Sequence, residues 1–244
     1  MVVREAWKMS NSFMEFIDGH PYLFANLPAL VAVLLLTRLT SNRGYWRAAV
    51  FSGLACTPFS LAELVARGYW RPVLLGGMRY GVEDLIFCYT AGAAAWLAAV
   101  YWSRETCVVE LRNLRTAILR IMLWGIPAAA VGFGLGLAGM DHISSTLIPA
   151  AGCLLFLLSR RASLWRLTLA GIVSFTPLYV LVVKLQFAVW PNYITYWNAN
   201  GPWGTLALGI PRGELAWAAM LGAVWPVLIA SALDVRFDGR SSPA

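Results

Sequence analysis

Seven long apolar runs constrain the fold of this chain more than any other feature of its sequence. They cover approximately Tyr22–Leu39, Ala48–Ala66, Val82–Trp102, Ala117–Gly139, Ile143–Leu158, Leu167–Val189 and Leu206–Leu233. Most of them reach the ~17–25 residues that an α-helix needs to cross a bilayer. Helices are expected because backbone groups in lipid must find their hydrogen-bond partners within the segment. The sequence therefore predicts an all-α integral membrane protein with seven transmembrane helices.

The composition of the 244 residues excludes several classes of protein. Hydrophobic residues make up 59% of the chain and charged residues 13%, whereas a soluble domain carries roughly 25% charged residues. A disordered chain, a nucleic-acid-binding domain and an ordinary water-soluble enzyme are thereby excluded. Only two histidines occur, His20 and His142, which leaves little room for a haem or a multi-histidine metal site. We expect no cofactor and no metal.

The Lys and Arg residues predict how the chain is oriented in the membrane. Twelve of the 19 lie in the loops after the first, third and fifth apolar runs and in the C-terminal tail, and the other seven lie on the opposite side. Cytoplasmic loops carry the excess of Lys and Arg. We therefore expect a multi-pass protein of the inner (cytoplasmic) cell membrane, with its N-terminus outside and its C-terminus in the cytoplasm.

Short motifs recur in the same order in the two halves of the chain. The matched pairs are Leu27-Pro28-Ala29 with Ile148-Pro149-Ala150, Trp46-Arg47 with Trp165-Arg166, and Thr57-Pro58 with Thr176-Pro177. In the third and seventh runs Asp84 matches Glu214, and an aromatic residue, Phe87 or Trp217, follows three residues later. Four helices separate equivalent members, so we expect two parallel three-helix repeats joined by the fourth helix, with a shared site at their interface.

The repeats define the expected organisation of the chain. Residues 1–102 hold the first repeat, 103–142 the linker and the fourth helix, 143–234 the second repeat, and 235–244 a cytoplasmic tail.

Few acidic residues lie within the apolar runs or at their edges. They are Glu63, Glu83, Asp84, Glu214 and Asp234. An ionised carboxylate at the centre of a bilayer costs at least ~2.5 kcal/mol, so such residues are functional candidates. Structural ion pairs are the alternative. Glu63 stands four residues before Arg67, a spacing that favours an ion pair on a helix. For the acids of the third and seventh runs, the candidate ion-pair partners are Arg71, Arg79 and Arg212. Asp234 borders the tail, where a solvated carboxylate is expected.

The twelve Trp residues fall into two groups. Those near the predicted ends of the runs are typical of an interfacial aromatic belt. The others lie inside the runs, at Trp96, Trp124, Trp217 and Trp225. A structural role for these residues is packing between helices or contact with lipid. The alternative is a functional role, in which the face of the aromatic ring stabilises a carbocation.

Four segments resemble a known family. They are Gly68-Tyr69-Trp70, the turn Leu75-Gly76-Gly77, the stretch from Gly81 to Phe87 (GVEDLIF) and the stretch from Leu208 to Leu215 (LGIPRGEL). Together they resemble the integral-membrane lycopene cyclase family of bacteria, archaea and fungi, and the resemblance extends from about Tyr22 to Asp234. Each of the two domain copies in that family has a helix that begins with Pro, one residue, two acids and then aromatic residues. Here Gly81 replaces the first proline and Gly213 replaces an acid of the second copy.

The resemblance implies a lycopene β-cyclase-like activity, an intramolecular lyase or isomerase reaction without net oxidation. A carboxyl group protonates a terminal double bond, the carbocation closes a ring, and a base removes a proton. On this basis the predicted catalytic residues are Glu83, Asp84 and Glu214. The predicted substrate-binding residues are Glu63, Phe87, Trp96 and Trp217.

The resemblance to the cyclase family also implies the expected partners. An apolar isoprenoid or carotenoid substrate would enter from the lipid bilayer, no nucleic acid is expected, and a homo-oligomer is left open. The alternative functions are a divergent isoprenoid-modifying enzyme, a non-catalytic carotenoid- or lipid-binding subunit, and a transporter that uses Glu63, Glu83 and Arg212 as an ion path.

Overall fold

A computed structural model describes residues 14–39, 43–64, 68–101, 106–108 and 113–238 of the chain. The α-helices are α2 (Pro21–Leu39), α3 (Arg43–Cys56), α4 (Val82–Tyr101), α5 (Leu114–Leu137), α6 (His142–Arg160), α7 (Trp165–Val189) and α8 (Arg212–Ala232). Short 3-10 helices are η1 (Thr57–Leu64), η3 (Leu75–Gly77), η5 (Ala162–Leu164) and η6 (Pro191–Tyr196). The strands are β1 (Thr106–Val108), β2 (Leu206–Ala207), β3 (Ile210–Pro211) and β4 (Arg236–Asp238).

Six of the helices, α2, α4, α5, α6, α7 and α8, are long and apolar enough to cross a membrane. They match the first and the third to seventh predicted runs. The prediction of an all-α, multi-pass membrane protein is therefore confirmed at the level of helix type, length and composition.

The second predicted run, Ala48–Ala66, forms a different structure from the other six. Its α-helix, α3, begins earlier, at Arg43, and ends at Cys56, after which η1 continues as a 3-10 helix to Leu64. Pro58 accounts for the change because proline lacks a backbone N–H and its ring clashes with the carbonyl of the preceding turn. With 14 residues, α3 alone is shorter than a bilayer-spanning helix.

The seventh predicted run begins too early. Residues Leu206–Ala207 pair with Ile210–Pro211 in a β-hairpin, and the helix starts only at Arg212. Leu208 and Gly209 form the two-residue turn, with φ values of 55° and 79°. Positive φ at both positions matches the turn that joins most tight hairpins, and glycine adopts it without steric cost. The predicted helical start at Leu206 is therefore wrong.

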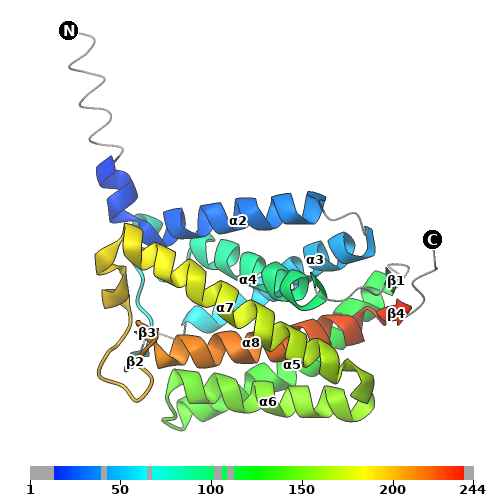
Figure 1. The fold of residues 1–244 in the computed structure, drawn as a ribbon. Coiled ribbons are helices and arrows are strands. Elements are labelled where there is room, and N and C mark those ends of the chain that lie inside the picture. Colours follow the sequence, from blue (N-terminus) through cyan, green and yellow to red (C-terminus); the bar gives the residue numbers. More distant parts are fainter. Residues whose placement is uncertain (1–13, 40–42, 65–67, 102–105, 109–112, 239–244) are drawn as a thin grey trace.

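Helices α4 and α8 form the centre of the bundle (Figure 1). Helices α2 and α3 pack on α4, helices α6 and α7 pack on α8, and α4 also contacts α7 and α8. Few residues of the outer helices α5, α6 and α7 are fully buried, between 11% and 17% in the apolar window of each, as expected for helices that face lipid.

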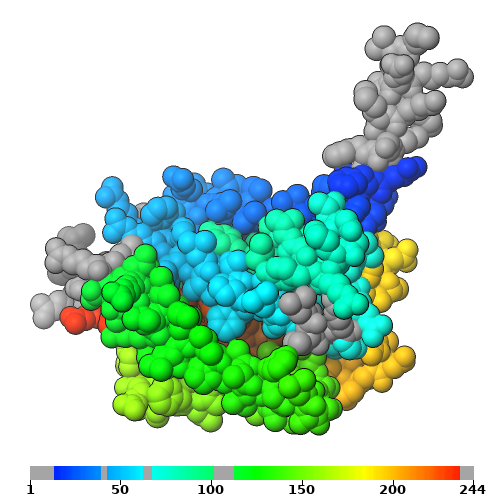
Figure 2. All heavy atoms as spheres, turned by 180° about the vertical axis from the view of Figure 1, so that it is seen from behind, coloured from blue at the N-terminus to red at the C-terminus, as the bar shows by residue number. Residues whose placement is uncertain are grey.

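Glycine residues let the central helices approach their neighbours closely. A Cβ atom on Gly92 of α4 would lie 2.5 Å from the Cβ of Cys56 in α3. A Cβ atom on Gly222 of α8 would lie 2.7 Å from the carbonyl oxygen of Gly171 in α7. Figure 2 shows the opposite face of the molecule, where α5 lies beside α3 and η1. At this contact a Cβ atom on Gly125 of α5 would lie 2.8 Å from the ring of Phe59 in η1. Small residues at helix crossings are common in membrane bundles.

Different contacts close the two ends of the bundle. At one end β1 pairs with β4, and Arg161 donates hydrogen bonds of 2.9 Å to the carbonyls of Ala230 and Val235. At the other end the loop after η1 meets the loop after α7 through an antiparallel β-bridge between Trp70 and Trp197. Helix α3 and η1 together connect the first end to the second (Figure 1).

Candidate functional site

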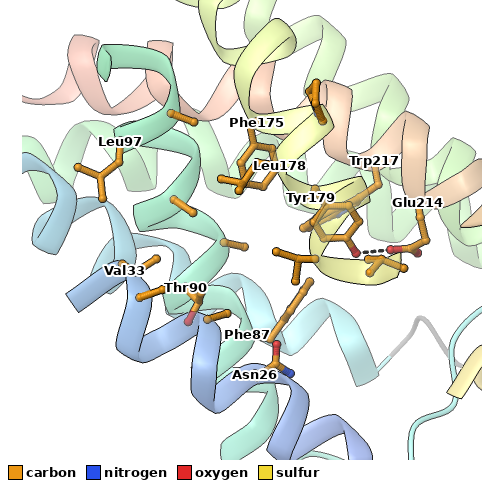
Figure 3. Close-up of a pocket in the computed structure, with 18 of the residues that line it drawn as sticks. Asn26, Val33, Phe87, Thr90, Leu97, Phe175, Leu178, Tyr179, Glu214 and Trp217 are labelled. Atoms are coloured by element: carbon orange, nitrogen blue, oxygen red, sulfur yellow. Dashed lines mark hydrogen bonds between the residues drawn. The ribbon is translucent and has the colours of Figure 1, made fainter. Parts of the chain in front are cut away.

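A cavity of about 960 Å³ lies among α2, α4, α7 and α8. Most of its lining side chains are apolar or aromatic, and they come from nearly the whole length of α2 and α4. In Figure 3, side chains from these four helices point into the space between them, with Asn26 and Val33 on α2 and Thr90 and Leu97 on α4. The helices thus enclose an elongated space suited to an apolar molecule.

Glu214 supplies a carboxyl group to this cavity. It lies in the first turn of α8 and is only 8% exposed. The hydroxyl of Tyr179 donates to its Oε2 atom (dashed in Figure 3), and the indole N–H of Trp197 donates to its Oε1 atom at 2.8 Å. Both oxygens are therefore held in place by side chains from outside α8.

Tyrosines outside the membrane-spanning helices surround the same carboxyl group. The hydroxyl of Tyr69 lies near Glu214 without making a hydrogen bond of ordinary geometry. Burial and, after it, the charge of Glu214 raise the pKa of Tyr69 and of Tyr193. These phenols therefore keep their protons over the physiological pH range and add no charge beside Glu214.

The position of Tyr69 explains why glycine fits immediately before Glu214. A Cβ atom at Gly213 would lie 2.7 Å from Cζ of Tyr69 and 3.0 Å from Cγ1 of Ile143. The ring of Tyr69 thus fills the space that a side chain at position 213 would need. A larger residue before Glu214 would therefore force this ring to move.

Aromatic rings from three helices lie in a row beside Glu214. The rings of Phe87 and Trp217 stack, with centroids 5.6 Å apart and an interplanar angle of 26°. Tyr179 lies 5.3 Å from Trp217, and Phe175 lies 6.0 Å from Tyr179. All four line the cavity. Such faces attract a cation, more strongly where water is excluded.

Glu83 and Asp84 are buried but are not among the residues that line the cavity. The Oε1 atom of Glu83 accepts the backbone N–H of Leu75 at 2.6 Å, and the Oδ2 atom of Asp84 accepts that of Gly81 at 2.9 Å. The side chain of Tyr22, which does line the cavity, also hydrogen-bonds to Asp84. The acidic pair therefore fixes the start of α4 and reaches the cavity only through Tyr22.

One predicted substrate-binding residue, Trp96, lies away from the cavity. Trp96 is fully buried in the core, and its indole N–H donates to the carbonyl of Tyr45 at 3.2 Å. It packs between helices and is not among the lining residues. The side chain of Glu63 and its predicted partner Arg67 lie outside the described part of the structure.

The sequence interpretation missed the residues that hold Glu214. Tyr179 lies within an apolar run, shortly after Thr176-Pro177. A tyrosine hydroxyl among apolar residues needs a hydrogen-bond partner, and this need was the signal that the sequence offered. Trp197 and Tyr69 come from loops, and their spacing gave no indication that the two loops pair. The site combines proton donors, a carboxyl group and aromatic faces in a cavity lined mainly by apolar groups. Such a site can give a proton to an apolar molecule and stabilise the resulting cation.

No protein-family model matches the chain, and neither a curated protein nor a solved structure matches it.

Proposed function

We propose that the chain is a membrane-embedded cyclase that acts on a linear isoprenoid hydrocarbon of the lycopene type. The observation that carries the proposal is the place of Glu214. Its carboxyl group faces an elongated apolar cavity beside the stacked rings of Phe87 and Trp217. An acid next to aromatic faces in a dry cavity is what a proton-initiated ring closure requires.

The proposed reaction balances with Glu214 as the single reacting side chain. Its carboxyl group donates a proton to the terminal double bond and leaves a carbocation at the substituted carbon. The π electrons of the next suitable double bond form the ring C–C bond, and the positive charge moves into the ring. A ring C–H bond then gives its electrons to a new double bond and its proton to the Glu214 carboxylate. The product is an isomer of the substrate, and the acid is regenerated.

The contacts of Glu214 support this role. Tyr179 and Trp197 hold its two oxygens by hydrogen bonds, so the carboxyl group keeps one orientation throughout the cycle. The row of rings formed by Phe87, Trp217 and Tyr179 stabilises the carbocation between the two proton transfers. Glu83 and Asp84 position the start of α4, from which Phe87 projects.

Two parallel repeats account best for this arrangement. Residues 81–88 and 211–218 have the same sequence of buried and exposed positions, and Phe87 and Trp217 occupy equivalent places in them. Gly92 and Gly222 each stand eight residues after the acid and contact the preceding helix. With α3 and η1 as one further crossing, the chain would span the membrane seven times, and its N-terminus would lie outside the cell according to the Lys and Arg bias.

The proposed substrate reaches the cavity from the bilayer. Exposed apolar residues of α2 and α7 line the cavity at the protein surface: Leu36, Leu39, Val173 and Leu178. The cavity therefore opens sideways between these two helices, toward the position of the lipid chains. An isoprenoid hydrocarbon moves from lipid into such a cavity without exposing apolar surface to water.

A non-catalytic carotenoid- or lipid-binding subunit is the second candidate. The backbone hydrogen bonds of Glu83 and Asp84 and the glycine at position 213 favour it, because they leave Glu214 as the one acid among the described residues that line the cavity. The two functions differ in how they depend on that acid. A binding subunit keeps its ligand when Glu214 is replaced by Gln, whereas a cyclase loses its product.

Pigment analysis of a lycopene-producing bacterial host tests the proposal. The host expresses the wild-type chain, E214Q, or E15Q as a matched control with the same chemical change at an exposed glutamate. We expect ring-bearing pigment with the wild type and E15Q, and roughly a hundredfold less or none with E214Q at equal membrane levels. Unchanged lycopene with well-inserted wild-type protein would contradict the proposal, as would full activity of E214Q.

A further inference from the structure

The two ends of the cavity differ in their chemistry. One end holds Glu214, and contacts from Trp197 to Trp70 and from Trp70 to Tyr22 place this end at the start of α2. The ring centroids in these contacts are 4.0 and 5.5 Å apart. The other end lies near the C-terminal ends of α2 and α4. Its lining residues are Leu36, Leu39, Tyr45, Leu97, Val100 and Tyr101.

The ends lie far apart compared with the reach of a proton transfer. Lining residues on α2 extend from Tyr22 to Leu39, a distance of about 25 Å at the helical rise of ~1.5 Å per residue. A general acid must come within roughly 3 Å of the atom that it protonates. A group at the Leu39 end is therefore out of reach of Glu214.

Within the part of the chain that the structure describes, no second acid lines the far end of the cavity. Among the described residues that line the cavity, Glu214 is the one acidic side chain. Glu83 and Asp84 lie at the start of α4 and bind backbone N–H groups there. A long molecule in the cavity presents one of its ends to an acid, and its other end meets apolar and tyrosine side chains.

We infer that the protein closes one ring in each binding event, so that a substrate with two equivalent ends is cyclised in two separate visits. This inference rests on the proposed cyclase function. After the first ring forms, the molecule has to withdraw through the opening between α2 and α7 and enter again with its other end toward Glu214. The monocyclic compound is therefore released into the bilayer and competes there with fresh substrate for the cavity.

A time course with purified protein in liposomes that contain lycopene tests the inference. Chromatography separates lycopene from monocyclic and bicyclic products at each time point. With lycopene in large excess, we expect the monocyclic compound to appear first and to exceed the bicyclic one at least about tenfold during early turnover. Raising the ratio of lycopene to protein lowers the bicyclic share further, because the two substrates compete.

A second arm supplies the monocyclic compound directly. We expect it to be converted to the bicyclic product, and added lycopene to slow that conversion in proportion to its share of the total. Bicyclic product that forms from the first time point, in a ratio independent of excess lycopene, would overturn the inference while leaving the cyclase function intact. Absence of any ring-bearing product would instead refute the proposed function and the inference with it.

Discussion

The rings of Phe87 and Trp217 stack on each other with their centroids 5.6 Å apart, although 130 positions separate them in the chain. Each follows an acidic residue of its own helix by three positions, Phe87 after Asp84 and Trp217 after Glu214. The stack therefore joins the starts of α4 and α8 and forms one wall of the cavity beside Glu214. If the protein is a cyclase, the carbocation forms against these rings.

Replacement of Trp217 tests the role of the stack. W217A removes an aromatic face next to the reacting atoms, and the loss of a cation–π contact of ~1–2 kcal/mol lowers the rate roughly five- to thirtyfold. W217F keeps a ring and should retain most of the activity. Conversion of lycopene per inserted protein measures the effect, with W165A, at an exposed Trp, as control. Equal losses in W217A and W217F would speak against cation stabilisation.

Isosteric amide variants separate the roles of the acidic residues. E83Q keeps the oxygen that accepts the N–H of Leu75, and D84N keeps an acceptor for Gly81. We expect each to lower conversion per inserted protein by less than about fivefold, against roughly a hundredfold for E214Q. A loss in E83Q or D84N as large as in E214Q, with unchanged thermal stability, would place these acids in the proton transfer.

Filling the cavity should block the substrate without touching the acid. Ala94 lines the middle of the cavity on α4, and A94F would place a ring in the path of a long apolar chain. We expect lycopene conversion to fall at least about tenfold, while A129F, on an exposed position of α5, leaves it unchanged. Retention of full activity in A94F would mean that the substrate lies elsewhere.

Arg161 should stabilise the opposite end of the bundle. Its guanidinium group donates to the carbonyl of Ala230, which also accepts the N–H of Val235, and to the carbonyl of Val235 just beyond the end of α8. R161A should cost about 2 kcal/mol of folding free energy and lower Tm by roughly 4–8 °C. Thermal unfolding in detergent measures this, with R160A as the neighbouring exposed control. Equal Tm values for the two variants would contradict the account.

Most of the helices were predictable from the sequence because lipid imposes a simple rule on length and apolar composition. The exceptions have local causes. Pro58 ends α3 early, and the hairpin turn at Leu208 and Gly209 delays the start of α8. Apolar character alone predicts neither, since both segments are as hydrophobic as a helix in lipid.

The candidate site was predictable only where the two halves of the sequence match. Glu214, Phe87 and Trp217 were expected from that match and do line the cavity. Tyr179 and Trp197, which hold Glu214, were not, because their place depends on the packing of α7 against α8 and on the pairing of two distant loops. Trp96, expected at the substrate, is packed in the core because it lies further along α4 and turns toward α3.

Deuterium labelling tests the central claim most directly, namely that a solvent-exchangeable proton from Glu214 starts the ring closure. Purified protein equilibrated in D₂O and present in excess over lycopene performs a single turnover, and mass spectrometry reads the product. The account predicts that each ring gains one deuterium and loses one hydrogen, and that E214Q forms no labelled ring. Ring-bearing product without deuterium, or labelled product from E214Q, would contradict it.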